Sequence, residues 1–67
     1  MASRPPCWFC GVEQRTAGYQ AYLALFDMNS EAEIERRLIG EPCADYTAAA
    51  LVAVKALHAV NFGPPQQ

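Results

Sequence analysis

The sequence predicts a small α+β domain, in which a cysteine-bearing turn is followed by a β-hairpin and a C-terminal α-helix. Three features predict it: a Cys-x-x-Cys motif at residues 7–10, an aromatic-rich stretch at 19–26 and a long apolar stretch at 45–61. The chain has 67 residues, of which 52% are hydrophobic and 18% charged, a composition typical of a folded domain and not of a disordered tail. Three short helices in an all-α arrangement are the alternative.

The first half of the hairpin is predicted by residues 19–26, which read YQAYLALF between Gly18 and Asp27. Aromatic residues between turn-forming residues favour a strand, although the alanines and leucines leave a helix open. Residues 27–30 (DMNS) are typical of a turn. A strand that ends in this turn predicts a partner strand after it.

The segment that follows the turn can be interpreted in two ways. Ser30 and Glu33 match a capping box, and Gly40 would then end a short helix. The same residues can form the returning strand of the hairpin over 33–41. We prefer the strand because of the elements that flank it.

The last element is a helix that Asp45 caps and that runs from residue 47 to about residue 61. Gly63 and Pro64 are typical residues for its end. We expect a single domain over the whole chain, with flexible ends at 1–6 and 63–67.

The three cysteines carry the strongest chemical signal. Cys7 and Cys10 are spaced as two thiolate ligands of one tetrahedral zinc ion, and Cys43 lies just before the helix, where its thiolate would be a third. Two alternatives are open: the thiols pack as small apolar side chains, or the Cys7/Cys10 pair performs redox chemistry. An odd number of cysteines is also atypical of a secreted disulfide scaffold.

A Cys-x-x-Cys-Gly turn, a hairpin and a cysteine at the start of a helix resemble a treble-clef zinc finger, including the small bacterial and phage proteins of that type. The resemblance covers residues 7–60 and implies one Zn²⁺ held by Cys7, Cys10 and Cys43.

The fourth ligand is the point where this chain departs from the family pattern. That pattern has a second Cys or His on the first helical turn, and here Tyr46 stands in its place, three residues after Cys43. Asp45 is the nearest oxygen donor. His58 lies about 22 Å along the helix from Cys43, so it would reach the metal only from another chain.

The apolar residues of the helix predict self-association. They lie nearly all round it, and a short hairpin covers only one side. Alanines at several positions would let a second backbone approach closely, and a copy of the chain across a two-fold axis is the simplest partner. Lys55 and His58 mark the edge that faces solvent. The expected interface residues are Leu51, Val52, Val54, Leu57 and Val60 of the helix, with Trp8 and Phe9 of the turn.

The composition and the terminal residues argue against several classes of function. A net charge of −2, with a pI near 5.1, argues against nucleic acid as a partner. No secretory signal and no stretch long enough to span a membrane are recognisable, so we expect a cytoplasmic protein. No second histidine, positioned base or phosphate loop supports an enzyme.

The sequence therefore predicts a zinc-stabilised protein-interaction module that forms a homodimer and binds or regulates another protein. A zinc-finger regulator that binds nucleic acid is the first alternative, and a Cys-x-x-Cys redox protein is the second.

Overall fold

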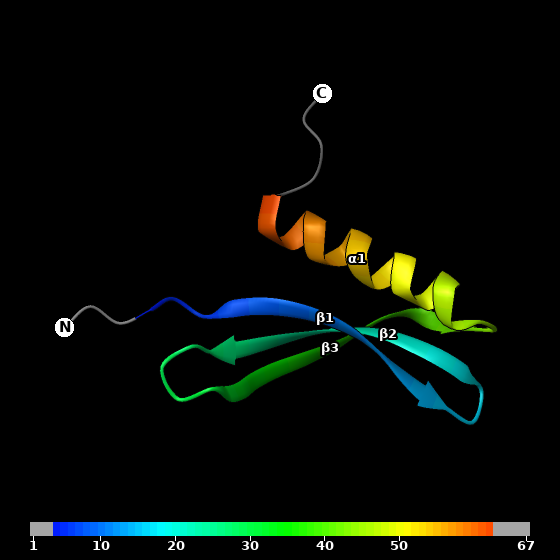
Figure 1. Cartoon of the computed structure of the whole chain (residues 1–67), viewed down its shortest axis with the longest axis horizontal. Helices are drawn as coiled ribbons and strands as arrows, with labels where there is room; N and C mark the ends of the chain where they lie inside the picture. The colour runs from blue at the N-terminus through cyan, green and yellow to red at the C-terminus, as the bar shows by residue number, and fades with distance from the viewer. Residues whose placement is uncertain (1–3, 63–67) are drawn as a thin grey trace.

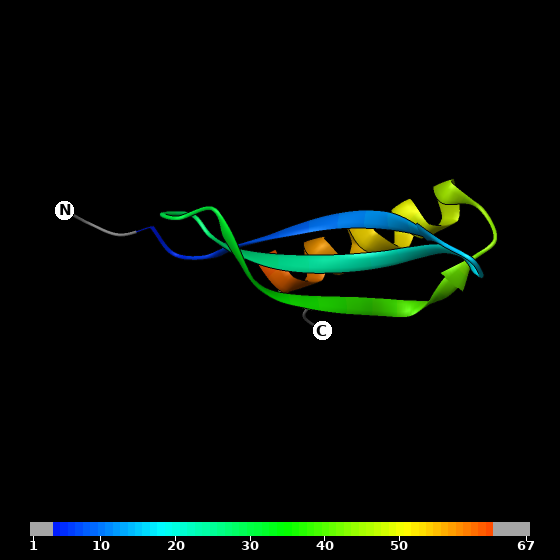
Figure 2. The same ribbon diagram turned by 90° about the horizontal axis from the view of Figure 1, so that it is seen from below.

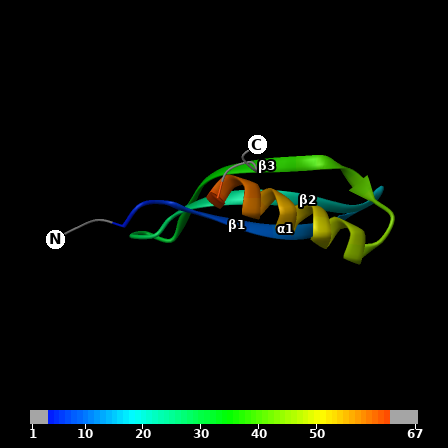
Figure 3. The same cartoon turned by 90° about the horizontal axis from the view of Figure 1, so that it is seen from above.

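The computed structural model describes residues 4–62, and these residues form an α+β fold (Figure 1). Three antiparallel strands make one sheet in the order β1-β2-β3, and a single helix lies obliquely across one of its faces. Figure 3 shows the sheet behind the helix, and Figure 2 shows the opposite face, which no helix or strand of residues 4–62 covers. The elements are β1 (Cys7–Arg15), β2 (Gly18–Asp27), β3 (Ala32–Cys43) and α1 (Tyr46–Phe62).

Most of the expected elements are confirmed. The strand over 19–26, the returning strand over 33–41 and the helix that begins after Asp45 are all present, so the helical alternative for residues 31–40 and the all-α alternative are wrong. Of the expected flexible ends, residues 1–3 and 63–67 lie outside the described part of the chain. That part contains no helix of the length and hydropathy needed to cross a bilayer.

The first element differs from the expectation. Residues 7–11 form no turn: they begin β1, which pairs with β2 from Cys7 opposite Phe26 to Arg15 opposite Gly18. The aromatic side chains of Trp8 and Phe9 favour extended backbone, and pairing along β2 satisfies the backbone groups that a turn would leave to water. A Cys-x-x-Cys spacing is equally compatible with a strand when no metal holds the two sulfurs together.

The β1–β2 hairpin is closed by the two residues Thr16 and Ala17. Gly18, which follows them, has φ of +133°, a conformation that residues with a side chain rarely adopt. A Cβ atom at Gly18 would also collide with the backbone carbonyl oxygen of Cys43. Glycine is therefore required where this turn meets the end of β3.

The β2–β3 turn is organised by Asp27. Its Oδ1 accepts a hydrogen bond from the backbone N–H of Asn29 at 2.9 Å, and its backbone carbonyl accepts one from the N–H of Glu31 at 2.7 Å. The pKa of Asp27 lies below its usual value, mainly because the hydrogen bond from the Asn29 backbone stabilises the ionised carboxylate. Asn29 also exchanges two 3.3 Å hydrogen bonds with the backbone of Arg4, so the N-terminal segment lies beside this turn.

The helix is anchored by its cap and by a close approach to the sheet. Oδ1 of Asp45 accepts hydrogen bonds from the backbone N–H groups of Thr47 and Ala48, at 2.8 and 3.2 Å, which confirms the predicted cap. Ala49 and Ala53 face the sheet and are fully buried. Because these side chains are small, the helix backbone packs directly against the strands.

The core is thin. On β2 the buried residues Ala21 and Leu23 alternate with residues of the opposite face, and Tyr19, which shares their side, contacts Tyr46 of α1 with ring centroids 5.8 Å apart. Within residues 4–62, no large side chain is fully buried. The interior is thus built mainly from alanines and one leucine, which is little apolar burial for a domain of this size.

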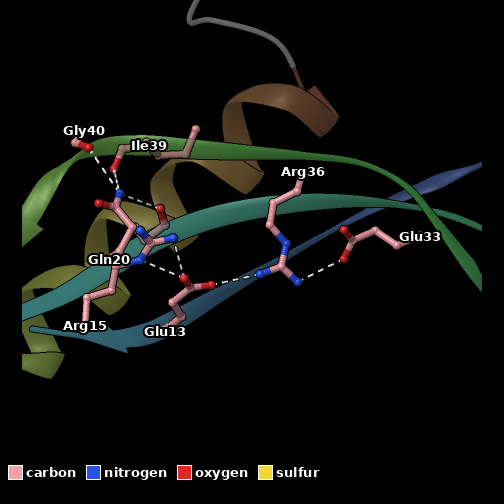
Figure 4. Close-up of polar contacts among 8 residues, drawn as sticks. Glu13, Arg15, Gln20, Glu33, Arg36, Ile39 and Gly40 are labelled. Atoms are coloured by element: carbon pink, nitrogen blue, oxygen red, sulfur yellow. Dashed lines mark hydrogen bonds and ion pairs between the residues drawn. The ribbon is translucent and has the colours of Figure 1, made fainter.

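Gln20 closes a gap in the sheet. Tyr19 pairs with Cys43 while Ala21 pairs with Ile39, so β3 carries extra residues at this point. The buried Nε2 of Gln20 lies 3.0–3.1 Å from the carbonyl oxygens of Ala21, Ile39 and Gly40 (Figure 4). Its amide thereby replaces ladder hydrogen bonds that the irregular register removes.

Candidate interaction surfaces

The outer surface of α1 is the first candidate. We define it by Leu51, Val54 and Phe62, whose exposed fractions are 57%, 56% and 74%, on the side of the helix opposite Ala49 and Ala53. Lys55 and His58 are exposed beside them, as expected, and the His58 ring contacts that of Phe62 at 4.8 Å. α1 contains no acidic residue, so the outer surface is apolar with one cation, Lys55, one turn after Leu51.

The other interface residues expected from the sequence occupy different environments. Val52 and Leu57 are half-buried, and Val60 is 38% exposed at the edge of the helix–sheet contact. Trp8 and Phe9 are neighbours in β1, so their side chains point to opposite faces of the sheet. They therefore do not form one aromatic tip.

The second candidate is the uncovered face of the sheet. Register and alternation place Phe9, Tyr22, Ala24, Phe26 and Arg36 on this face, away from α1. The rings of Phe9 and Phe26 meet edge to face at 5.5 Å. Ala24 is buried without any help from the helix, so the side chains on this face form a small apolar cluster of their own.

An ion-pair cluster crosses this face from β1 to β3. Arg36 donates from one nitrogen to Glu13 and from another to Glu33, both at 2.9 Å (Figure 4). Its guanidinium also lies 4.2 Å from the centroid of the Tyr22 ring. The pKa of Arg36 lies above its usual value, mainly because of the hydrogen bond to Glu33. The side chains of these pairs are partly exposed to solvent, so the pairs add little stability.

A shallow hollow lies at the end of the uncovered face next to the β2–β3 turn. Phe9, Phe26, Met28 and Glu31 line it, and its volume is about 400 Å³. Three apolar side chains and one carboxylate thus meet at one place on the surface.

The residues proposed for the metal are spread over the sheet. Cys7 pairs with Phe26 and Cys10 with Leu23, so the two thiols lie about 10 Å apart along β1 and point to opposite faces. Cys43 lies opposite Tyr19, nearer the far end of β2. Across residues 4–62, no three Cys, His, Asp or Glu side chains gather into a group that could hold a metal ion.

The two remaining proposed ligands are placed by α1. The carboxylate of Asp45 already accepts the capping hydrogen bonds of the helix, and His58 lies about three and a half turns further along, beside Phe62. Zinc binding thus stays a prediction from the cysteine spacing. Binding by both Cys7 and Cys10 would require β1 to change conformation, because a strand directs residues three apart to opposite sides.

In comparisons with known proteins, no family model matches the chain, and neither a curated protein nor a solved structure matches it significantly.

Several residues of these surfaces were not identified from the sequence. The cluster of Glu13, Arg36 and Tyr22 joins three strands, and only the register brings its members together. Met28 lies in the predicted turn and Glu31 in the segment with two interpretations, and no local pattern connects either residue with the distant Phe9. The mixed charges of β3 are a partial signal, since alternating acidic and basic residues are typical of a strand that faces solvent.

Proposed function

We propose that this chain is a protein-interaction module that forms a homodimer through the outer surface of α1, with a binding and not a catalytic role. The observation that carries the proposal is the exposure of Leu51, Val54 and Phe62 on one side of a helix whose opposite side already packs on the sheet. Burying a leucine or valine contributes about 1.5–3 kcal/mol, a large gain for a domain with so thin a core.

A second copy of the chain is the proposed occupant of this surface. An isologous dimer places the same apolar residues against one another across a two-fold axis, which requires no further complementary partner. Thr47, Lys55 and His58 are exposed and polar. Lys55 and His58 lie one turn after Leu51 and Val54 on the same side of the helix, so their apolar parts would pack within the dimer contact while their polar ends reach its rim.

Analytical ultracentrifugation over a range of protein concentrations tests the dimer. We expect the mass to rise from 7.3 kDa toward twice that value as the concentration increases. The double substitution Leu51→Gln and Val54→Gln should weaken the dimer at least tenfold, since it removes two buried apolar contacts.

Ile34→Gln is the matched control. Ile34 is 55% exposed, close to the 57% of Leu51, but it lies on β3 and not on the helix. A mass of 7.3 kDa at all concentrations, or equal weakening by Ile34→Gln, would contradict the proposal.

A further inference from the structure

The hollow beside the β2–β3 turn lies outside the surface proposed for the dimer, and its lining combines aromatic rings, a thioether and a carboxylate. The rings of Phe9 and Phe26 meet at 82°, Phe9 is 46% exposed, and Met28 adds a flexible thioether. Glu31 contributes the single carboxylate of the lining. Such a surface is complementary to a side chain that is apolar along its length and positively charged at its end.

Glu31 has a strained backbone at this site. Its φ of +63° makes it the one residue other than glycine in the left-handed region among residues 4–62. Glycine and asparagine adopt this conformation readily, whereas glutamate rarely does. Strain of this kind is often found where a side chain has a functional role.

The carboxylate of Glu31 is also distinct from those nearby in sequence. Arg15, Arg36 and Arg37 form ion pairs with Glu13, Glu33 and Glu35. In the described part of the chain, no ion pair engages Glu31. Its charge is thus available to a ligand in the hollow.

We propose that this hollow binds a lysine side chain of a partner protein. The four-carbon stem packs against Phe9, Phe26 and Met28, and the ammonium group pairs with the carboxylate of Glu31. This surface lies on the side of the sheet away from α1, so the proposal extends the interaction function to a second, independent surface.

The probe is the peptide acetyl-Ala-Lys-Ala-amide, titrated into ¹⁵N-labelled protein and followed by NMR. We expect its largest shifts at the amides of Phe9, Phe26, Met28 and Glu31, with a dissociation constant in the millimolar range for so small a ligand. The same peptide with norleucine in place of lysine keeps the apolar stem and lacks the charge, and we expect it to bind at least threefold more weakly.

Glu31→Gln tests the carboxylate directly, and Glu41→Gln is the matched control. Glu41 is an exposed residue of β3 near the opposite end of the sheet, so it lies away from the hollow. Its substitution changes the net charge by the same amount as Glu31→Gln. We expect Glu31→Gln to weaken lysine binding about two- to fivefold and to leave norleucine binding unchanged. Glu41→Gln should leave both dissociation constants within experimental error.

Glu31→Gly separates binding from folding. Glycine relieves the left-handed backbone, so the Tm should rise by about 5 °C while the preference for lysine over norleucine is lost. A variant that is more stable and binds more weakly cannot owe its weaker binding to unfolding.

Four results would overturn the proposal: norleucine binding as tightly as lysine, shifts centred away from the hollow, equal effects of Glu31→Gln and Glu41→Gln, or an arginine peptide binding more tightly than the lysine peptide. The double variant Leu51→Gln, Val54→Gln should bind lysine as the unaltered chain does. Failure of the hollow and failure of the dimer are therefore distinguishable.

Discussion

The ring of Tyr22 lies directly over Gly11, its partner on β1. A Cβ atom at Gly11 would stand 2.5 Å from both Cζ and Oη of Tyr22, well inside van der Waals contact. The guanidinium of Arg36, on β3, packs on the same ring, 4.2 Å from its centroid. The absence of a side chain at Gly11 thus sets the position of an aromatic ring and of the cation that packs on it.

Gly11→Ala should therefore destabilise the protein by about 1 kcal/mol, because the tip of the Tyr22 ring must move away from β1. Urea unfolding measures the loss, and the NMR signals of the Tyr22 ring should shift as Arg36 separates from it. Tyr22→Leu removes the ring, so Gly11→Ala in that background should cost much less. Equal costs in the two backgrounds would show that the Tyr22 contact is not the cause.

Asp45→Ala should destabilise the fold by about 1 kcal/mol, since it removes the acceptor of two backbone hydrogen bonds at the start of α1. Thermal and urea unfolding measure the change. Asp45→Ser keeps a capping oxygen and should retain most of the stability. If serine and alanine are equally destabilising, the cap is not the source of the effect.

Protonation of Asp27 should lower the stability of the fold in acid. The pKa of Asp27 is lowered in the folded state, so its contribution to the free energy of unfolding is fully present above the unfolded-state pKa of about 3.9. This contribution is lost as the pH falls from there through the lower folded-state pKa. Urea unfolding between pH 2 and 7 should show a smaller acid dependence for Asp27→Asn, which keeps an acceptor oxygen without the charge. Parallel pH profiles for the two proteins would contradict this assignment.

The zinc hypothesis predicts one zinc ion per chain in native mass spectrometry of protein expressed with zinc and never exposed to a chelator. It also predicts that Cys10→Ser abolishes binding and most of the stability, since structural zinc contributes on the order of 10 kcal/mol to small domains. Because Cys7 and Cys10 face opposite sides of β1, binding by both must alter amide exchange in that strand. A metal-free protein whose thermal melt is unchanged by Cys10→Ser would refute the hypothesis.

The elements that could be predicted from the sequence are those with local signals. Asp45 before an alanine-rich stretch indicates a helix start, and aromatic residues ahead of Asp27 indicate a strand that ends in a turn. These signals depend on neighbouring residues, so they persist whatever the rest of the chain does. The exposed apolar residues of α1 could be anticipated in the same way, because one thin sheet covers only one side of a helix.

What could not be predicted depends on pairing between distant residues. Cys7 to Gly11 have the composition of a turn when considered alone, and only their pairing with β2 makes them a strand. The position of Tyr22 over Gly11 likewise follows from the register. The hollow requires Phe9 of the first strand to meet Glu31 of the second turn, and no local pattern connects them.

The strand order has a consequence for aggregation. β1 and β3 are both edge strands, and their outer backbone groups can pair with another chain. β3 carries Glu33, Glu35, Arg36 and Arg37 in its first half, and such charges disfavour pairing of one edge with another. The first six residues of β1 (CWFCGV) carry no charge, so this is the edge at which the sheet would most readily acquire a further strand.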